Sequence, residues 1–168
     1  MRAMFAAGLA ALAIFGSTCI ALGKASHADW PQIDVLLMNK QDQSRPLSGH
    51  PNANNELLGG HGNDTIHAGP WGDVIWGDYK PCCQPAKQVD NLYGGPGRDF
   101  IYASHGTNFI FTGGGRDEVH AHFGRGGEIH CESRGVLVYI SHRSRPHYRL
   151  FGCHRISYKT EAMRARGS

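Results

Sequence analysis

The stretch GGHGNDTIH, residues 59–67, decides the fold of this chain. It places three glycines, one aspartate and one isoleucine within nine residues. Taken alone, such a stretch suits a flexible loop, a phosphate-binding loop or one copy of a repeat. The sequence on either side distinguishes these three interpretations.

The spacing of this stretch recurs along the chain. An acidic or amide residue stands at Asn55, Asp64, Asp73, Asp90, Asp99, Asn108 and Asp117, at intervals of 9, 9, 17, 9, 9 and 9 residues. An aliphatic residue follows each of them by two positions, at Leu57, Ile66, Ile75, Leu92, Ile101, Ile110 and Val119. The one long interval contains an insertion, KPCCQPAKQ. A fixed short period of this kind indicates a solenoid built from repeated units.

These units resemble the calcium-binding nonapeptide of the RTX, or haemolysin-type, repeat family, GGxGxDxUx, where U is a large aliphatic residue. Residues 59–67 and 94–102 (GGPGRDFIY) match it fully, and residues 112–120 (TGGGRDEVH) match it nearly. The resemblance covers residues 52–120 and implies a secreted bacterial protein. Residues 128–158 also resemble the end segment of short secreted bacterial proteins that carry these repeats, through their cysteine spacing.

The chemistry of the unit predicts its structure. A glycine-rich turn can adopt positive φ values, and three residues then form a short strand with only the aliphatic side chain facing inward. The resemblance implies that two units complete one coil of a flattened roll, and strands of successive coils pair at about 4.8 Å. We therefore expect an all-β fold, a parallel β-roll (β-solenoid) with a disulfide-linked C-terminal cap.

The same resemblance implies calcium as the cofactor. Stacking brings the acidic positions into two rows, Asn55, Asp73, Asp99 and Asp117 in one, and Asp64, Asp90 and Asn108 in the other. Carboxylates and the carbonyls of glycine turns suit a hard divalent cation, and we expect roughly one to three ions. The expected side-chain ligands are Asp64, Asp73, Asp90, Asp99, Asn108 and Asp117, with the backbone carbonyls of Gly59, Gly60, Gly94, Gly95, Pro96, Gly113 and Gly114.

Some of these positions depart from the pattern. Trp71 stands where the family has glycine, which weakens the expectation for Asp73. Asp90 and Asn108 also follow turns that have lost glycines, so Asn55 and Asn108 can instead form amide hydrogen bonds. The best-formed interval lies between Asp99 and Asp117.

The chain divides into four segments by composition. Residues 1–28 combine a basic residue, an apolar run and a small-residue end, which predicts a signal peptide. An uncleaved membrane anchor, or a lipoprotein attached through Cys19, is the alternative. Residues 29–51 are expected to form a capping strand and linker, residues 52–127 the roll with an insertion at 78–89, and residues 128–168 a C-terminal cap and basic tail. We expect a secreted or cell-envelope location.

Export places the remaining cysteines in an oxidising compartment. Cys82, Cys83, Cys131 and Cys153 allow three pairings. The pairing of Cys131 with Cys153 is favoured because these residues bracket the segment after the glycine-rich region. In the chain-entropy model, closing that loop raises the free energy of unfolding by about 3 kcal/mol. Adjacent Cys82 and Cys83 then form a vicinal bridge or stay partly free. No CxxC pair suggests zinc.

Other chemistries find little support in the sequence. The chain has no GK[ST], HExxH or GxSxG motif, which argues against a P-loop, a metallopeptidase and a serine hydrolase. His67 and His120 occupy the ninth position of their units, where we expect exposed strand residues. Between residues 134 and 168 the chain has seven arginines and one lysine but only one acid, Glu161. We interpret this segment mainly as a solvated cap, and the alternative is binding to an anionic cell surface.

Two functions remain. The first is a non-catalytic, calcium-binding β-roll, monomeric, with no nucleic-acid partner and with a structural or adhesive role at the cell envelope. The second is an extracellular protein that binds or degrades polysaccharide. Its binding surface would use the aromatic residues Trp71, Trp76, Tyr79, Tyr93, Tyr102 and Phe111. Its acids and bases would come from Glu118, His120, His122, Glu128 and Glu132.

Overall fold

A computed structural model describes residues 29–39, 46–78, 85 and 87–159 of the 168-residue chain. The predicted signal peptide, Cys19, Tyr79, the adjacent Cys82 and Cys83 and the tail beyond residue 159 lie outside the described residues.

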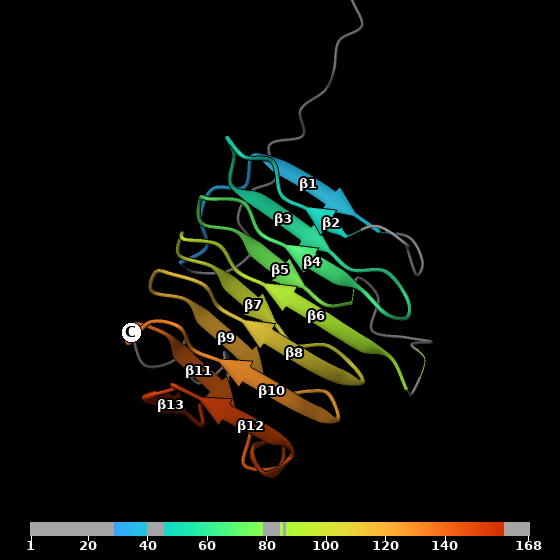
Figure 1. The fold of residues 1–168 in the computed structure, drawn as a ribbon, viewed down its shortest axis with the longest axis vertical. Helices are drawn as coiled ribbons and strands as arrows, with labels where there is room; N and C mark the ends of the chain where they lie inside the picture. Colours follow the sequence, from blue (N-terminus) through green and yellow to red (C-terminus); the bar gives the residue numbers. More distant parts are fainter. Residues whose placement is uncertain (1–28, 40–45, 79–84, 86, 160–168) are drawn as a thin grey trace, which may run out of the picture.

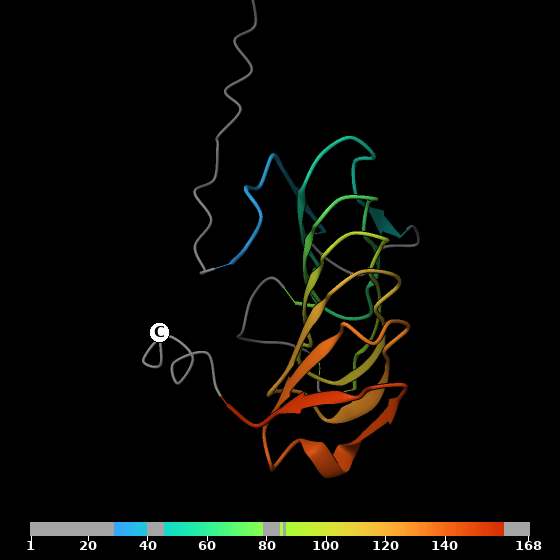
Figure 2. The same cartoon turned by 90° about the vertical axis from the view of Figure 1, so that its left-hand side faces the viewer.

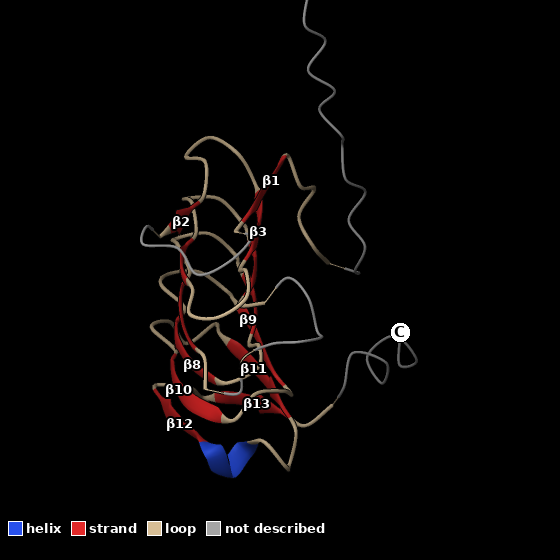
Figure 3. Cartoon of the chain, turned by 90° about the vertical axis from the view of Figure 1, so that its right-hand side faces the viewer, coloured by secondary structure: helices blue, strands red, loops and turns tan. Residues whose placement is uncertain are grey.

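Short strands account for almost all of the regular structure (Figure 1). In chain order they are β1 (Val35–Met38), β2 (Leu47–Ser48), β3 (Asn55–Leu58), β4 (Thr65–His67), β5 (Val74–Trp76), β6 (Val89–Tyr93), β7 (Phe100–Tyr102), β8 (Thr107–Phe111), β9 (Glu118–Ala121), β10 (Gly126–His130), β11 (Leu137–Ile140), β12 (Tyr148–Phe151) and β13 (Arg155–Ser157). One 3-10 helix, Arg145–His147, lies at the end of the roll beside β12 (Figure 3). The described part holds no helix that is long and apolar enough to cross a bilayer.

The strands form two parallel sheets that face each other. Odd-numbered strands pair in the order β1-β3-β5-β7-β9-β11-β13, and even-numbered strands pair in the order β2-β4-β6-β8-β10-β12. Each coil of the chain therefore supplies one strand to each sheet, and Figure 2 shows the two sheets edge-on as the walls of a flattened roll. This arrangement confirms the predicted all-β parallel β-roll.

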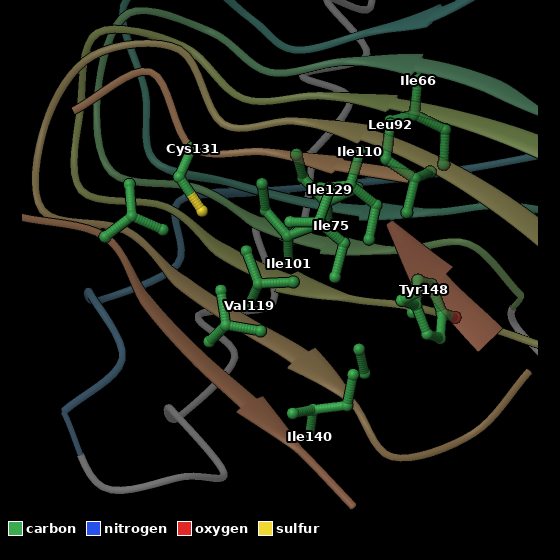
Figure 4. Packing of buried hydrophobic residues seen from close by; sticks show 14 of the residues in the cluster. Ile66, Ile75, Leu92, Ile101, Ile110, Val119, Ile129, Cys131, Ile140 and Tyr148 are labelled. Carbon is green, nitrogen blue, oxygen red and sulfur yellow. The ribbon is translucent and has the colours of Figure 1, made fainter. Parts of the chain in front are cut away.

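The aliphatic positions of the repeat form the core between the sheets. All seven predicted residues, from Leu57 to Val119, are fully buried. The strand register places aliphatic residues of neighbouring strands beside one another, since Ile101 pairs with Ile75 on one side and with Val119 on the other. Figure 4 shows these side chains converging from both sheets on one interior. Each coil buries only two such side chains, so the stability of the roll depends on the contacts between coils.

The stack of coils continues beyond the glycine-rich repeats. On the N-terminal side, Leu37 pairs with Leu57 and Leu47 pairs with Ile66. On the C-terminal side, buried Ile129 and Val138 continue the two aliphatic columns in β10 and β11, whose turns lack the repeat motif. The aliphatic spacing therefore persists where the acidic residue has been lost.

A disulfide between Cys131 and Cys153 closes the C-terminal end, as predicted. Cys131 follows β10 and Cys153 lies just after β12, and these two strands are paired neighbours. The bond therefore joins the last two coils of the even-numbered sheet.

The prediction of exposure for the ninth-position histidines is correct for His67 and wrong for His120. His120 is only 5% exposed and stacks between Tyr102 and Tyr139 on the outer face of the odd-numbered sheet. Trp30, from the segment before β1, donates a hydrogen bond to the Tyr102 hydroxyl at 3.0 Å and also packs against Trp76. The outer face of this sheet is therefore partly covered by the chain itself.

Replacing an aliphatic residue in the core tests this packing. We predict that Ile101→Ala lowers the free energy of unfolding by about 2–5 kcal/mol, because the neighbouring coils cannot close the cavity. The matched control is Ile156→Ala on the terminal strand β13, where the side chain is 38% exposed and the loss should stay below about 1 kcal/mol. Urea unfolding in saturating calcium measures both, and equal losses would contradict this account of the core.

Candidate functional site

Two rows of buried polar side chains run along the roll, one at the start of each set of strands. Asn55, Asp73, Asp99 and Asp117 form the first row and Asp64, Asp90 and Asn108 the second, and none of the seven is more than 2% exposed. Strand register places Asp90 directly beside Asn108. Hydrogen bonds link Asp64 to Asp90 and connect the members of the first row. The grouping agrees with the two rows expected from the sequence.

Two backbone N–H groups hold the Asp99 carboxylate. Oδ1 accepts the N–H of Asp73 in the preceding coil at 2.8 Å, and Oδ2 accepts the N–H of Gly95 in its own turn at 2.7 Å. Asp73 is held in the same way, by Asn55 in the preceding coil and by Gly69 in its own turn. The repeat therefore uses the carboxylate both to close its turn and to join neighbouring coils.

Trp71 does not disturb this arrangement at Asp73. Its side chain is 57% exposed and donates a hydrogen bond from Nε1 to the Pro51 carbonyl at 3.2 Å. The glycine missing from this turn therefore leaves the position of the Asp73 carboxylate unchanged.

Amide groups cap the N-terminal end of each row. The Asn55 carboxamide donates to Asp73 Oδ1 at 2.9 Å, and the Asn39 carboxamide donates to Asp64 Oδ1 at 3.0 Å. Asn39 lies outside the repeat, and sequence reasoning missed it because no period points to it.

Neutral groups also end the rows on the C-terminal side. Val136 precedes β11 and lies opposite Asp117, so the first row stops at an apolar side chain. Asp117 Oδ2 is buried with no hydrogen-bond partner of ordinary geometry. In the second row the hydroxyl of Tyr148 lies 3.5 Å from the Asn108 amide nitrogen. Burial raises the pKa of that hydroxyl, so it stays protonated. Between these ends, the rows contain three pairs of aspartates in neighbouring coils. The pairs are Asp73 with Asp99, Asp99 with Asp117, and Asp64 with Asp90.

Asp90 has different partners from the other aspartates. Its Oδ2 accepts hydrogen bonds from the Ser104 hydroxyl at 2.7 Å and from the Gln88 carboxamide at 3.2 Å. Ser104 stands where intact units have glycine, and its N–H donates to Asn108 Oδ1 at 3.0 Å. Side-chain donors therefore help to hold Asp90, so this end of the second row is partly satisfied by the protein itself.

Burial makes the ionised form of these carboxylates unfavourable. The pKa of Asp99 is raised to about 7, mainly by desolvation and also by the charges of Asp117 and Asp73, although hydrogen bonds from two backbone N–H groups oppose the rise. Desolvation likewise raises the pKa of Asp90 to about 7 and that of Asp117 to about 6, and it raises the pKa of Asp73. In the described part of the chain, Asp73, Asp99 and Asp117 form no ion pair with a basic side chain.

The turns bring carbonyl oxygens close to these carboxylates, since a Cβ on Gly94 would lie 2.2 Å from the Thr112 carbonyl oxygen and 3.0 Å from Asp99 Oδ2. A Cβ on Gly95 would lie 2.0 Å from the Gly69 carbonyl oxygen, and one on Gly113 would lie 2.4 Å from that of Gly95. Gly113 has the positive φ expected of such turns, +74°, but at Gly95 the need for glycine comes from this close approach. A methyl group at either position would displace the carbonyl group of the preceding coil. The stacked turns therefore keep a line of carbonyl oxygens beside the first row.

This donor set fits calcium. All of the donors are carboxylate or carbonyl oxygens, which a hard cation with six to eight ligands prefers. The described residues contain no cluster of three or more His, Cys, Asp and Glu side chains suited to a metal ion, so carboxylates alone do not complete a site. A calcium ion beside these carboxylates would need further oxygen ligands, which backbone carbonyls of the turns or water can supply.

Four of the six aromatic residues proposed as a polysaccharide surface, Trp76, Tyr93, Tyr102 and Phe111, belong to ladders of stacked rings, whereas Trp71 is exposed outside them and Tyr79 lies outside the described residues. On the even-numbered sheet, His67, Tyr93, Phe111, His130 and Phe151 stack with ring centroids 4.5, 5.1, 4.6 and 4.4 Å apart. Trp76, Tyr102, His120 and Tyr139 form a second ladder on the other sheet. Each inner ring covers the faces of its neighbours, so only ring edges point outward. These ladders support the sheets and offer few open faces for sugar stacking.

The acids considered for catalysis do not converge. Glu118 lies in β9 of the odd-numbered sheet and pairs with Arg98 at 2.6 Å, whereas Glu128 lies in β10 of the other sheet and pairs with Arg149 at 2.9 Å. Each glutamate precedes an inward-facing core residue in its strand, so its side chain lies on the outer face of its sheet. The two side chains therefore lie on opposite outer faces of the roll. Glu132 accepts the N–H of Gly113. Glu118 and Glu128 therefore cannot form the carboxyl pair that glycoside hydrolysis requires.

Comparison with known proteins identifies the repeat. The family model of the RTX calcium-binding nonapeptide repeat matches residues 52–75 and 88–119, in four copies. No curated protein and no solved structure gives a significant match to this chain.

The raised pKa values predict an unusual pH dependence without calcium. Between the ordinary Asp pKa of 3.8 and about 7, the folded chain retains protons that the unfolded chain has released, so stability falls as the pH rises. We predict that the chain in chelator keeps more β-structure at pH 4.5 than at pH 8, measured by far-ultraviolet circular dichroism. Saturating calcium should restore the spectrum at pH 8. A metal-free chain that gains structure as the pH rises would contradict these burial effects.

Proposed function

This chain carries RTX calcium-binding nonapeptide repeats at residues 52–75 and 88–119, and from that premise we propose that it is a secreted, non-catalytic β-roll that calcium orders after export. Its role is structural or adhesive at the cell envelope. The observation that carries this proposal is the first row, in which Asp73, Asp99 and Asp117 are buried one above another and form no ion pair within the described residues.

The intervals between successive aspartates are the proposed calcium positions. In the first row these are the intervals on either side of Asp99, with the carbonyl oxygens of Gly69 and Gly95 close by. The second row offers one interval, between Asp64 and Asp90. Asn108 makes amide hydrogen bonds to Ser104 instead, so we assign it a capping role in preference to a calcium contact.

Calcium supplies positive charge and accepts oxygen ligands in these intervals, and the protein positions those ligands. The backbone N–H groups of the turns orient the carboxylates, and the aliphatic columns fix the distance between coils. Extracellular calcium modules bind at about 0.1–1 mM, whereas cytosolic calcium is much scarcer. Because binding to the folded state alone stabilises that state, ordering is expected to follow export.

The separation of Glu118 from Glu128 supports a non-catalytic role. Glu118 and Glu128 lie on opposite walls, and His120 is stacked between aromatic rings. We expect no cleavage in a screen of uronate polymers with the calcium-saturated protein. Turnover of any polymer, lost in Glu118→Gln or Glu128→Gln, would contradict this part of the proposal.

A pair of substitutions tests the calcium assignment. We predict that Asp99→Asn weakens calcium binding more than Asp64→Asn, because Asp99 borders two aspartate intervals and Asp64 borders one. Both changes remove one charge from a buried, hydrogen-bonded side chain, so each controls for the other. Isothermal calorimetry gives affinity and stoichiometry, and circular dichroism gives the calcium midpoint of ordering.

The expected result is a loss of two binding events in Asp99→Asn and of one in Asp64→Asn. The reverse order would mean that the second row holds most of the calcium. Identical circular dichroism spectra in chelator and in millimolar calcium would overturn calcium ordering altogether.

A further inference from the structure

The coil that follows Asn108 has exchanged its acidic residue for basic and aromatic ones. In β10, Gly127 pairs with Asn108, so glycine stands where the earlier coils of this row carry Asp64 and Asp90. The turn before it, residues 122–125, reads HFGR in place of a glycine-rich, acid-terminated turn. This turn has therefore lost the carboxylate needed for calcium and has gained a cation and an aromatic ring.

A hollow of about 460 Å³ opens at this turn. It is lined by His122, Phe123, Arg125, Arg143, Ser144 and His147, together with Gly124. None of these lining residues is acidic, whereas elsewhere on the roll Arg98 and Arg149 are paired with glutamates. Within the described residues, the guanidinium groups of Arg125 and Arg143 form no ion pair, and both side chains are exposed. The hollow therefore favours an anion.

Phe123 gives this hollow an open ring face. It is 72% exposed, and unlike the ladder residues it stacks on no other ring of the described chain. An exposed aromatic ring can pack against the C–H face of a sugar ring, and a guanidinium can hold a planar carboxylate through two parallel hydrogen bonds. A uronic acid residue presents both features at once.

The backbone of the turn is fixed by three hydrogen bonds. The Arg125 N–H donates to the Gly106 carbonyl at 2.6 Å, the Tyr148 hydroxyl to the Phe123 carbonyl at 3.2 Å and the Ser144 hydroxyl to the His122 carbonyl at 2.8 Å. Tyr148 also reaches Asn108, at the end of the second row. The hollow is therefore held in shape by the coil that ends the calcium-binding part, which reduces the ordering cost of binding.

We propose that this hollow is the adhesive site of the roll and binds a uronate residue of an acidic polysaccharide. Arg125 and Arg143 hold the carboxylate and Phe123 packs against the sugar ring. The assignment rests on the proposed adhesive function and gives it a ligand class. It separates the basic end of the chain, which binds the polymer, from the acidic rows, which bind calcium.

Calorimetry on the protein purified after export, in saturating calcium, tests this assignment. The probe is a tetrasaccharide of alternating glucuronate and N-acetylglucosamine, and the neutral comparison is a tetrasaccharide of N-acetylglucosamine alone. We expect binding of the acidic probe only. Arg125→Gln should weaken it about tenfold, as expected for loss of a charged hydrogen-bonded pair. Phe123→Ala should weaken it about fivefold through loss of ring packing.

The control is Arg149→Gln, which removes the same charge from an exposed arginine outside the hollow, paired with Glu128. Its affinity for the acidic probe should stay within about twofold of the parent protein. An equal loss in Arg149→Gln, or equal binding of the neutral probe, would overturn the site. Binding of anionic lipid vesicles or single-stranded DNA with the same Arg125 dependence, and none of the oligosaccharide, would overturn the ligand class.

Circular dichroism on the same samples separates this proposal from the previous one. A chain that calcium orders but that binds no acidic probe refutes the hollow alone. A chain that calcium does not order refutes calcium ordering, whatever the probe does.

Discussion

Stacking aspartate carboxylates inside the turns of a roll is the constraint on which the rest of this structure depends. Asp73, Asp99 and Asp117 are withdrawn from water in successive coils, and their charges repel one another. Backbone N–H groups lower the cost of burying these carboxylates but do not remove it, because the pKa of Asp99 remains near 7. The metal-free roll thus favours protonated carboxylates, and a cation between them would offset their repulsion once they ionise.

The hydrophobic columns and the carboxylate rows depend on each other. Each coil contributes one aliphatic side chain from each sheet, too little to fold alone, so the coils must stack. Stacking for the sake of the core brings the aspartates together whether or not calcium is present. The protein therefore couples a non-specific driving force, burial of apolar surface, to a specific ion. Amides at Asn55 and Asn39, and the neutral groups of Val136 and Tyr148, limit the rows at both ends.

The period of the repeat predicts most of the fold. Nine-residue spacing of aliphatic and acidic residues correctly places the seven core residues, the two rows and the parallel pairing of alternate units. It does not reach the coils at β10 to β13, because the turns before these strands lack the glycine and aspartate pattern of the repeat. It also cannot identify Asn39, Ser104 or Tyr148, since these side chains reach the rows through tertiary contacts. The repeat period also does not predict the burial of His120, because the residues that cover it come from distant segments.

The count of bound calcium ions tests the central claim most directly. Equilibrium dialysis of the purified protein against millimolar calcium, followed by atomic emission spectroscopy, gives the number of ions retained per chain. The three aspartate intervals predict up to three ions, and Asp99→Asn should retain no more than one. A parent protein that retains none, or an Asp99→Asn variant that retains the full number, would contradict the claim that the buried carboxylate rows hold the calcium.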